Sequence, residues 1–374
     1  MKSLTSWLHR LTLINGESGP KLDYFRVFVS GKEALDIDDW LFTIDPQHSV
    51  STDPFYGNSK AWSVLRLPEI QEVEMNIKNR HRFSVDLACV LSLALERRVI
   101  IPMDLPVRSS AQTIEFLSLA EIADQSIDAP IPMDAKNRVI DYLTAIAGLS
   151  SDDQDIIGDA STAYYGALLL FDREPRAAYT LLIAGIESLS RKYGLPPTDW
   201  HEWELSKEWD EAFDAQSLSS KQAEAFRIRL LADKHLRLSM TFRNYASSRV
   251  LDSFWDKSLN QWIPGVNAST GEQLPRRPMT ARKVSDFISK DRAVLKKLLG
   301  KSYNLRSSVV HESSWIDLMK LGQPVPNADY RSFALSFPIL RVLLAELIRI
   351  EISERSSSVE LPDFQLFREV PRDT

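Results

Sequence analysis

After residue 150, apolar residues recur at intervals of three and four positions almost to the end of the chain. The clearest case runs from Pro175 to Gly194, PRAAYTLLIAGIESLSRKYG, with proline in the first turn and glycine after the last. This spacing places the apolar side chains on one face of a helix, and the proline and glycine mark its two ends. Several such helices must bury their apolar faces against one another. The sequence therefore predicts a mainly α-helical fold.

The N-terminal part of the chain has a more mixed pattern. LDYFRVFVS, from Leu22, has strand character, whereas TIDPQHSVSTDPFYGNS, from Thr43, is rich in turn residues. We expect a mixed, mostly helical N-terminal region with a few short strands. The same periodicity predicts further helices over residues 77–98, 109–124, 135–148, 150–171, 219–250 and 329–355.

A chain of 374 residues is long enough for two domains. The best boundary is a gradual one near residue 150, where irregular mixed structure gives way to a helical bundle. We expect an N-terminal domain over residues 1–150, with a sensor or regulatory role and a regulatory protein or ligand as its partner. A helical domain follows over residues 151–356, and residues 357–374 form a C-terminal tail.

Composition excludes several classes of protein. The hydrophobic fraction of 44% and the aromatic fraction of 9% are typical of a folded globular protein. The single cysteine, Cys89, excludes an internal disulfide and a multi-cysteine metal site, and its apolar surroundings, DLACVLSLAL, favour a core position. No apolar run is long and uncharged enough to span a bilayer, and the first residues lack a signal-peptide pattern. We expect a soluble, cytoplasmic protein.

Charge is distributed unevenly along the chain, although the net charge is only −6. Residues 275–310 hold ten basic and two acidic side chains, and residues 196–218 hold seven acids and one lysine. A strip this basic attracts phosphates, which predicts contact with RNA; the alternative is a solvated helix face neutralised by the acidic segment. The RNA-binding candidates are Lys290, Arg292, Lys296, Lys297 and Lys301.

The acidic segment also contains a tryptophan cluster, Trp200, Trp203 and Trp209. Such side chains can stack on nucleic-acid bases or can anchor a core or interface. The neighbouring HEWE sequence, beginning at His201, is not followed by a histidine at helical spacing, so we expect no metal site there. No glycine-rich phosphate loop is present, and we expect no cofactor.

One late segment carries the strongest chemical signal, namely YNLRSSVVHESS from Tyr303 to Ser314. It places Arg306 and His311 five positions apart. Five positions correspond to about 140° around a helix, so only a helix end or a long arginine side chain brings the two groups together. The pair needs further context before it indicates function.

That context is a resemblance to a known family. Together with the segment at Pro175–Gly194, the motif resembles the HEPN superfamily, in particular its Apea-like branch, over about residues 155–355. The family has a helical bundle, an early helix with an IESL-type stretch, here Ile186–Leu189, and a late segment with Arg, a polar residue, apolar residues and His. Ser307 occupies the polar position, where active members often carry Asn, Asp or His.

The resemblance implies a metal-independent endoribonuclease that acts as a toxin or an antiviral-defence effector. A histidine that titrates near neutrality suits proton transfer in an attack of the RNA 2′-hydroxyl on phosphorus, and an arginine suits the charge of the transition state. The catalytic candidates are Arg306 as clamp, His311 as acid or base, and Ser307. The resemblance adds Glu187, which orients one of the two basic groups or else forms a surface ion pair.

Two further expectations follow from the resemblance. The family places two motifs across a dimer, so we expect a homodimer with both His311 residues near the two-fold axis. The apolar helix at Phe337–Ile350 is a candidate for the dimer contact, and its alternative role is in the core. The alternative function is a catalytically inert HEPN-fold module that binds RNA or protein.

Overall fold

The computed structural model divides the chain into two compact units. The first comprises Met1–Glu174, Asn260–Ala281 and Arg349–Thr374, and the second comprises Pro175–Leu259 and Arg282–Ile348. Contacts group residues 151–174 with the N-terminal part of the chain, whereas the sequence analysis assigned them to the following domain. The structure describes residues 4–6, 8, 22–29, 37–38, 43–51, 59–68, 77–101, 134–171, 174–196, 199–203, 205–259, 265–266, 273–274, 282–311 and 334–358.

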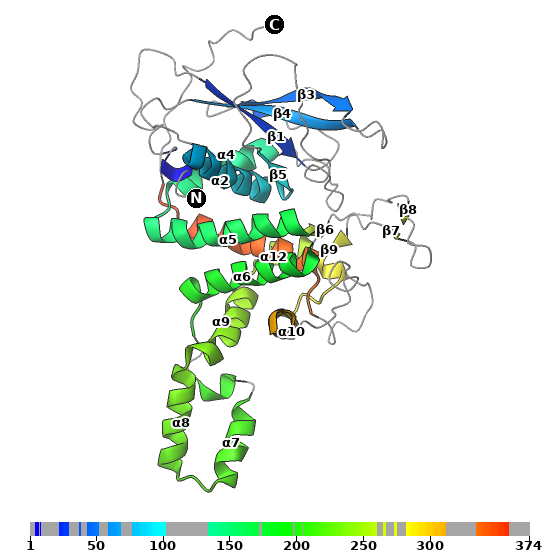
Figure 1. Ribbon diagram of the computed structural model, residues 1–374. Coiled ribbons are helices and arrows are strands. Elements are labelled where there is room, and N and C mark those ends of the chain that lie inside the picture. The colour runs from blue at the N-terminus through cyan, green and yellow to red at the C-terminus, as the bar shows by residue number, and fades with distance from the viewer. Residues whose placement is uncertain are drawn as a thin grey trace. The chain divides into compact units, whose positions relative to one another are not determined.

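The first unit contains an antiparallel sheet of five strands in the order β2-β3-β4-β1-β5 (Figure 1). β1 pairs along most of its length with β4, with Phe25 opposite Leu65, and its end pairs with β5. The strand character predicted from Leu22 onward is confirmed. The bounds are β1 Leu22–Val29, β2 Ile37–Asp38, β3 Thr43–Ser51, β4 Ser59–Pro68 and β5 Val99–Ile100.

Strand β3 corrects the prediction that residues from Thr43 onward form turns. The segment pairs with β4 despite Pro46, which lies opposite Ser63, and the register shifts between Gln47 and Val50. On the other side, β2 pairs with β3 only at two positions, so in the described residues Pro46 faces no partner there. Proline has no backbone N–H to donate, so it is tolerated where a strand has no partner on one side. Pro46 is therefore compatible with a strand.

Helices α2 (Ile77–Leu95), α4 (Ala135–Ala147) and α5 (Ser151–Leu170) form the helical part of the first unit, and α2 packs against both of the others. The Ser150 hydroxyl accepts a hydrogen bond from the Asp153 N–H and so caps the start of α5. The helices predicted over residues 77–98, 135–148 and 150–171 are confirmed to within a few residues. The helix predicted over residues 109–124 and the tail beyond residue 358 lie outside the described residues.

In the second unit, helix α9 (Lys234–Arg249) packs against α6 (Pro175–Tyr193) and α10 (Arg292–His311) (Figure 1). α9 and α10 approach closely at Gly300, where an added Cβ would lie 2.9 Å from Cδ of Arg243. The helix predicted over residues 175–194 is confirmed. Its predicted apolar stripe is buried at Ala178, Leu182, Gly185, Ile186 and Leu189, whereas Leu181 is half-buried.

Helix α12 (Phe337–Arg355) is the last described helix, and it begins eight residues later than predicted. Of its predicted apolar residues, Phe333 lies outside the described residues, and Leu340, Leu343 and Leu347 are fully buried. These side chains therefore behave as core residues within a single chain. That burial favours the core role over the alternative in which this helix supplies an exposed dimer contact.

The single helix predicted over residues 219–250 is wrong, because the chain breaks it into two. α8 (Ser220–Ala232) ends before Asp233, whose φ of −68° and ψ of 123° are extended, and α9 begins at the next residue. Aspartate is among the preferred residues at a helix N-terminus, so Asp233 directly before Lys234 carried a local signal for the break.

Helices α7 (Ser206–Ala215) and α8 form an antiparallel pair, here called the α7–α8 hairpin together with the short helix η1 (Trp200–Glu202) (Figure 1). Ser217, with a positive φ of 53°, turns the chain between the two helices. Ser219 then starts α8 in a capping box, in which its hydroxyl and the Gln222 side chain each bind the other residue's backbone N–H.

The described residues form mostly helices, so the predicted mainly α fold is confirmed. Among those same residues, no helix combines the length and the apolar character needed to cross a membrane.

Candidate functional site

The face between α6 and α10 holds the predicted site residues Glu187 and Arg306. Glu187 is 5% exposed, although it is acidic. Its carboxylate accepts a hydrogen bond from Arg191, one turn later on α6, whose side chain is 58% exposed. A buried carboxylate keeps its charge only when it is paired, and Arg191 supplies that partner. Glu187 therefore forms an ion pair in which the carboxylate is buried and the arginine is exposed. This pair differs from a simple surface ion pair, and it does not by itself show that Glu187 orients Arg306 or His311.

Tyr303 and Arg306 lie three positions apart on α10, so their side chains leave the helix on the same side. The Tyr303 ring packs on Phe242 of α9, with ring centroids 5.2 Å apart. The pKa of the Tyr303 phenol is raised, first by burial and then by the negative charge of Glu187, while the positive charges of Arg306 and Arg191 act in the opposite direction.

These interactions define what is here called the α6–α10 cluster, made of Glu187, Arg191, Tyr303 and Arg306. It combines one carboxylate, two guanidinium groups and one phenol that remains protonated at neutral pH. Within the described part of the chain, Nε of Arg306 is buried and has no hydrogen-bond partner. A buried N–H donor without a partner is uncommon, and it leaves this guanidinium with unused capacity to bind an anion.

The end of α10 carries the other two catalytic candidates. Ser307 is half-buried, and the helix continues to His311, its last residue. Arg306 and His311 are thus separated by about 140° on a regular helix that ends at the histidine. The two groups can converge only at a helix end or through a long arginine side chain, and α10 does end at His311. The side chain of His311 lies outside the described residues, so the convergence itself stays a prediction.

The five predicted RNA-binding residues have different surroundings. Arg292 donates from its two terminal nitrogens to the carbonyls of Ser248 and Val250, at 3.1 and 3.0 Å. These carbonyls lie at the end of α9, so Arg292 stabilises a helix C-terminus. Lys290 lies 3.6 Å from a carboxylate oxygen of Asp256. The remaining three lie on α10, with Lys297 exposed and Lys296 and Lys301 half-buried.

Sequence reasoning missed Arg191 and Tyr303 as members of the cluster. A signal for Arg191 was present, because an acid and a base four positions apart on a helix form a pair. The contact of Tyr303 with Phe242 joins two helices some sixty residues apart in sequence, and no local pattern indicates it. For the same reason, the bonds of Arg292 to α9 could not be read from α10 alone.

The other candidates for chemistry are structural. Burial raises the pKa of the Cys89 thiol to about 12, which leaves it protonated and unreactive at neutral pH. Trp200 and Trp203 are buried with Phe213 and Met240, so the packing alternative is confirmed for these two tryptophans. In the described residues, no group of three or more His, Cys, Asp or Glu side chains is arranged to hold a metal ion.

Comparison with known proteins adds no family to this geometry. No family model, no curated protein and no solved structure matches the chain.

Proposed function

We propose that this chain is a metal-independent endoribonuclease of the HEPN type, with Arg306 and His311 at the reacting phosphate. The observation that carries the proposal is the α6–α10 cluster, in which a guanidinium with an unused buried donor and a paired, buried carboxylate both act on the Tyr303 phenol. Positive charge held in place on a helix stabilises a phosphorane-like transition state without needing to reorganise.

The reaction proceeds by attack of the RNA's own 2′-hydroxyl on the adjacent phosphorus. A base removes the 2′-hydroxyl proton, the oxygen forms a bond to the adjacent phosphorus, and the bond from phosphorus to the 5′-oxygen breaks. The leaving 5′-oxygen takes a proton. The products are a 2′,3′-cyclic phosphate and a 5′-hydroxyl. His311 acts as the base or the acid, because an imidazole exchanges protons near neutral pH.

The other cluster residues position or bind. Arg306 holds two non-bridging phosphate oxygens through paired N–H groups, as the fork of a guanidinium allows. Glu187 and Arg191 fix the surface against which Arg306 lies, and the Tyr303 phenol donates to a phosphate oxygen. Ser307 touches phosphate or orients His311. Lys296, Lys297 and Lys301 extend along α10 and attract the RNA backbone.

We infer that two copies form a homodimer that joins two Arg306–His311 motifs in one groove. Cutting of cellular RNA by such a dimer suits a cytoplasmic toxin or antiviral-defence effector. An N-terminal region that senses a regulatory protein or ligand would hold the nuclease inactive until it is needed.

A module that binds RNA or protein without cutting is the second candidate. The ion pair of Glu187 with Arg191 favours it, because this carboxylate already has a partner on its own helix and is less available to orient a catalytic group. In this candidate, the basic residues of α10 provide affinity and the Arg306–His311 pair has no chemical role.

Incubation with a labelled RNA in EDTA separates the two candidates. Cleavage without metal is expected, with 2′,3′-cyclic phosphate ends. His311→Ala should lower the rate by about 10²-fold or more, the contribution of a general acid or base. Arg306→Lys, which keeps the charge and loses the planar fork, should lower it by at least about tenfold. His201→Ala is the matched control, because His201 is exposed on the short helix η1, and it should leave the rate unchanged.

Binding measured on the same variants completes the test. If His311→Ala binds RNA normally and the wild type cuts nothing, the binding module replaces the nuclease. If EDTA abolishes cutting, or if the products carry 3′-hydroxyl ends, the mechanism through the 2′-hydroxyl is wrong.

A further inference from the structure

The α7–α8 hairpin contains a continuous aromatic stack in which buried rings alternate with exposed ones. Ring centroids lie 6.2 Å apart for Trp203 and Trp209, 5.8 Å for Trp209 and Phe213, and 5.9 Å for Phe213 and Phe226. The stack starts in the cluster of Trp203 and Phe213, next to Met240 of α9. The exposed aromatic rings are therefore held in fixed positions by the buried ones.

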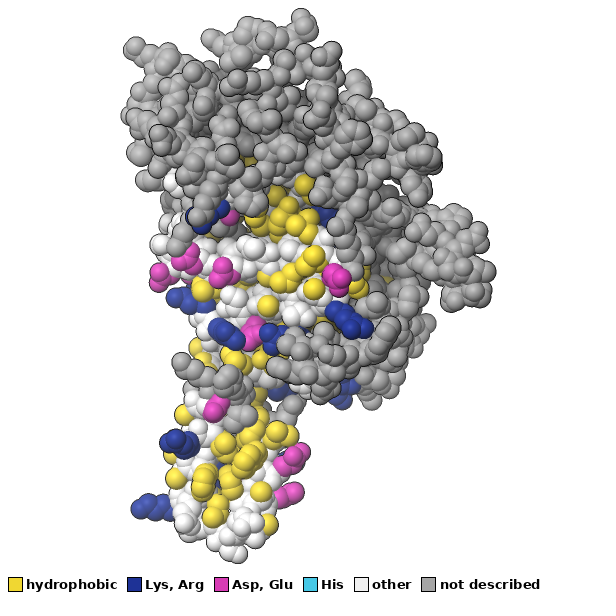
Figure 2. Space-filling view, in the orientation of Figure 1, with side chains coloured by type: hydrophobic (Ala, Val, Ile, Leu, Met, Phe, Trp, Pro, Cys, Tyr) yellow, Lys and Arg dark blue, Asp and Glu magenta, His cyan; other side chains and the backbone are white. Residues whose placement is uncertain are grey.

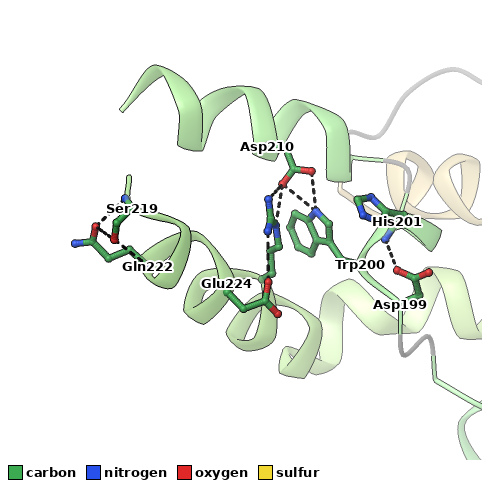
Figure 3. Close-up of polar contacts among 8 residues, drawn as sticks. Asp199, Trp200, His201, Asp210, Ser219, Gln222 and Glu224 are labelled. Atoms are coloured by element: carbon green, nitrogen blue, oxygen red, sulfur yellow. Dashed lines mark hydrogen bonds and ion pairs between the residues drawn. The ribbon is translucent and has the colours of Figure 1, made fainter. Parts of the chain in front are cut away.

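One edge of the hairpin satisfies its polar groups internally (Figure 3). Asp210 of α7 accepts hydrogen bonds from Nε1 of Trp200, at 3.0 Å, and from Nε of Arg227 of α8, at 3.0 Å. The Arg227 guanidinium also lies 3.4 Å from Glu224. This edge closes the two helices against each other and has little unused bonding capacity.

A second face of the hairpin exposes large apolar side chains. Leu205, Trp209 and Phe226 are 42%, 39% and 50% exposed. Leu205, Trp209 and Ala212 recur at spacings of four and three, so they share one face of α7, and Phe226 adjoins them across Phe213. Figure 2 shows hydrophobic side chains gathered along the part of the surface that α7 and α8 form. Rigid, exposed aromatic side chains in a group indicate an interaction surface.

Charges of opposite sign flank this apolar face. α7 holds four acids and one lysine, and α8 holds three basic residues and one acid. In Figure 2, Asp and Glu lie on the α7 side of the apolar side chains and Lys and Arg lie on the α8 side. By helical spacing, Glu208 is the acid next to the apolar face on α7, and Arg229 is its basic counterpart on α8.

We propose that the apolar face of the α7–α8 hairpin binds the same face of a second copy of this chain. A two-fold axis parallel to the helices places α7 of one copy against α8 of the other, so that acid meets base on both sides. An axis across the helices would instead place α7 on α7, acid against acid. The pattern of charge therefore selects one self-complementary arrangement, an antiparallel four-helix contact.

Single-stranded RNA is the competing occupant of exposed aromatic rings, and the charges disfavour it. Bases stack on aromatic side chains where nearby basic residues hold the phosphates. Here Trp209 lies on α7 with Glu208, Asp210, Glu211 and Asp214, which repel phosphates. This contact between copies is separate from the proposed catalytic groove and does not depend on nuclease activity.

Sedimentation equilibrium of the full chain tests the proposal. Trp209→Ser and Phe226→Ser should each weaken self-association at least about tenfold, the effect of losing a central aromatic contact. At a fixed concentration, the mass of the double variant should fall to half that of the wild type. Asp214→Arg is the control, because it reverses an exposed charge five positions from Trp209, about 140° away around α7, and it should not alter the mass.

Charge reversal supplies the sharper measurement. Glu208→Arg alone and Arg229→Glu alone should each self-associate at least about tenfold more weakly, because like charges then meet across the axis. A mixture of these two variants restores both opposite-charge pairs, so it should recover the mass of the wild type. Near-ultraviolet circular dichroism of each variant checks that the aromatic stack is intact.

The proposal is overturned if the wild type sediments as a monomer at about 100 μM. It is also overturned if the Trp209→Ser/Phe226→Ser double variant keeps the full mass of the wild type. It is equally overturned if the mixture of Glu208→Arg and Arg229→Glu stays as weakly associated as either variant alone. If an RNA oligonucleotide quenches tryptophan fluorescence in the wild type but not in Trp209→Ser, and no self-association is seen, this surface binds RNA and not a second copy.

Discussion

Ser302 of α10 anchors the chain that leads into α12. Its buried hydroxyl donates to the carbonyl of Leu298 on its own helix, at 3.0 Å, and accepts a hydrogen bond from the N–H of Leu335, at 2.9 Å. The carbonyl of Leu335 in turn accepts from the Tyr179 hydroxyl, at 2.9 Å. Ser302→Ala therefore leaves the Leu335 N–H without a partner in a place that water does not reach.

The expected loss in the free energy of unfolding for Ser302→Ala is large because a buried donor is left without an acceptor. Leaving one buried donor unsatisfied costs about 1–3 kcal/mol, more than the net gain from forming an ordinary bond. Ser190→Ala is the matched control, because Ser190 is equally buried and donates to the Glu187 carbonyl of its own helix. No described backbone N–H relies on it, so its loss should cost less than about 0.5 kcal/mol.

Urea unfolding at 25 °C, followed by circular dichroism, measures both free energies of unfolding. Ser302→Ala should lie at least about 0.5 kcal/mol below Ser190→Ala. Hydrogen exchange at Leu335 should rise in Ser302→Ala and stay slow in the control. If the two variants are equally stable, or if the Leu335 amide stays protected without the serine, the bond from α10 to this segment is not what holds it.

Three further predictions follow from the polar and ionisable groups. Burial opposes ionisation of Asp210, but the hydrogen bonds from Trp200 and Arg227 outweigh it and lower the pKa of this carboxyl. Its stabilising effect is therefore present above the ordinary aspartate pKa and is lost as pH falls through the lowered value, and carboxyl NMR should show Asp210 titrating below the ordinary aspartate value. Because its pKa is raised to about 12, Cys89 should react with a thiol reagent at pH 8 only after the chain is unfolded in urea. If the proposed nuclease is active, Tyr303→Phe should slow cleavage at least about tenfold at saturating RNA, with folding unchanged by circular dichroism.

Local signals predicted most of the helices, because each depends on residues close in sequence. Pro175 and Gly194 bound α6, and the apolar stripe between them is buried as expected. The break at Asp233 was missed because apolar periodicity continues on both sides of it. The sheet was harder to predict, since β3 contains turn residues and is stabilised by pairing with β4, a contact that no local pattern encodes.

The candidate site was predictable only in part, for a similar reason. Arg306 and Glu187 were identified through the motif, yet their neighbours depend on how α6, α9 and α10 pack. Arg292 illustrates the limit: its charge predicted phosphate contact, whereas the fold uses it to bind carbonyls at the end of α9. Charge alone does not distinguish a ligand-binding arginine from one that caps a helix.

A single 2′-deoxy substitution in the RNA tests the central claim most directly. The cleavage position is first mapped with the wild-type protein in EDTA, and the same oligonucleotide is then made with 2′-deoxyribose on the 5′ side of that bond. We predict that cleavage at this bond stops while binding is unchanged, because the attacking oxygen is gone. Cutting of the deoxy substrate at the rate of the RNA would contradict the mechanism and with it the roles proposed for Arg306 and His311.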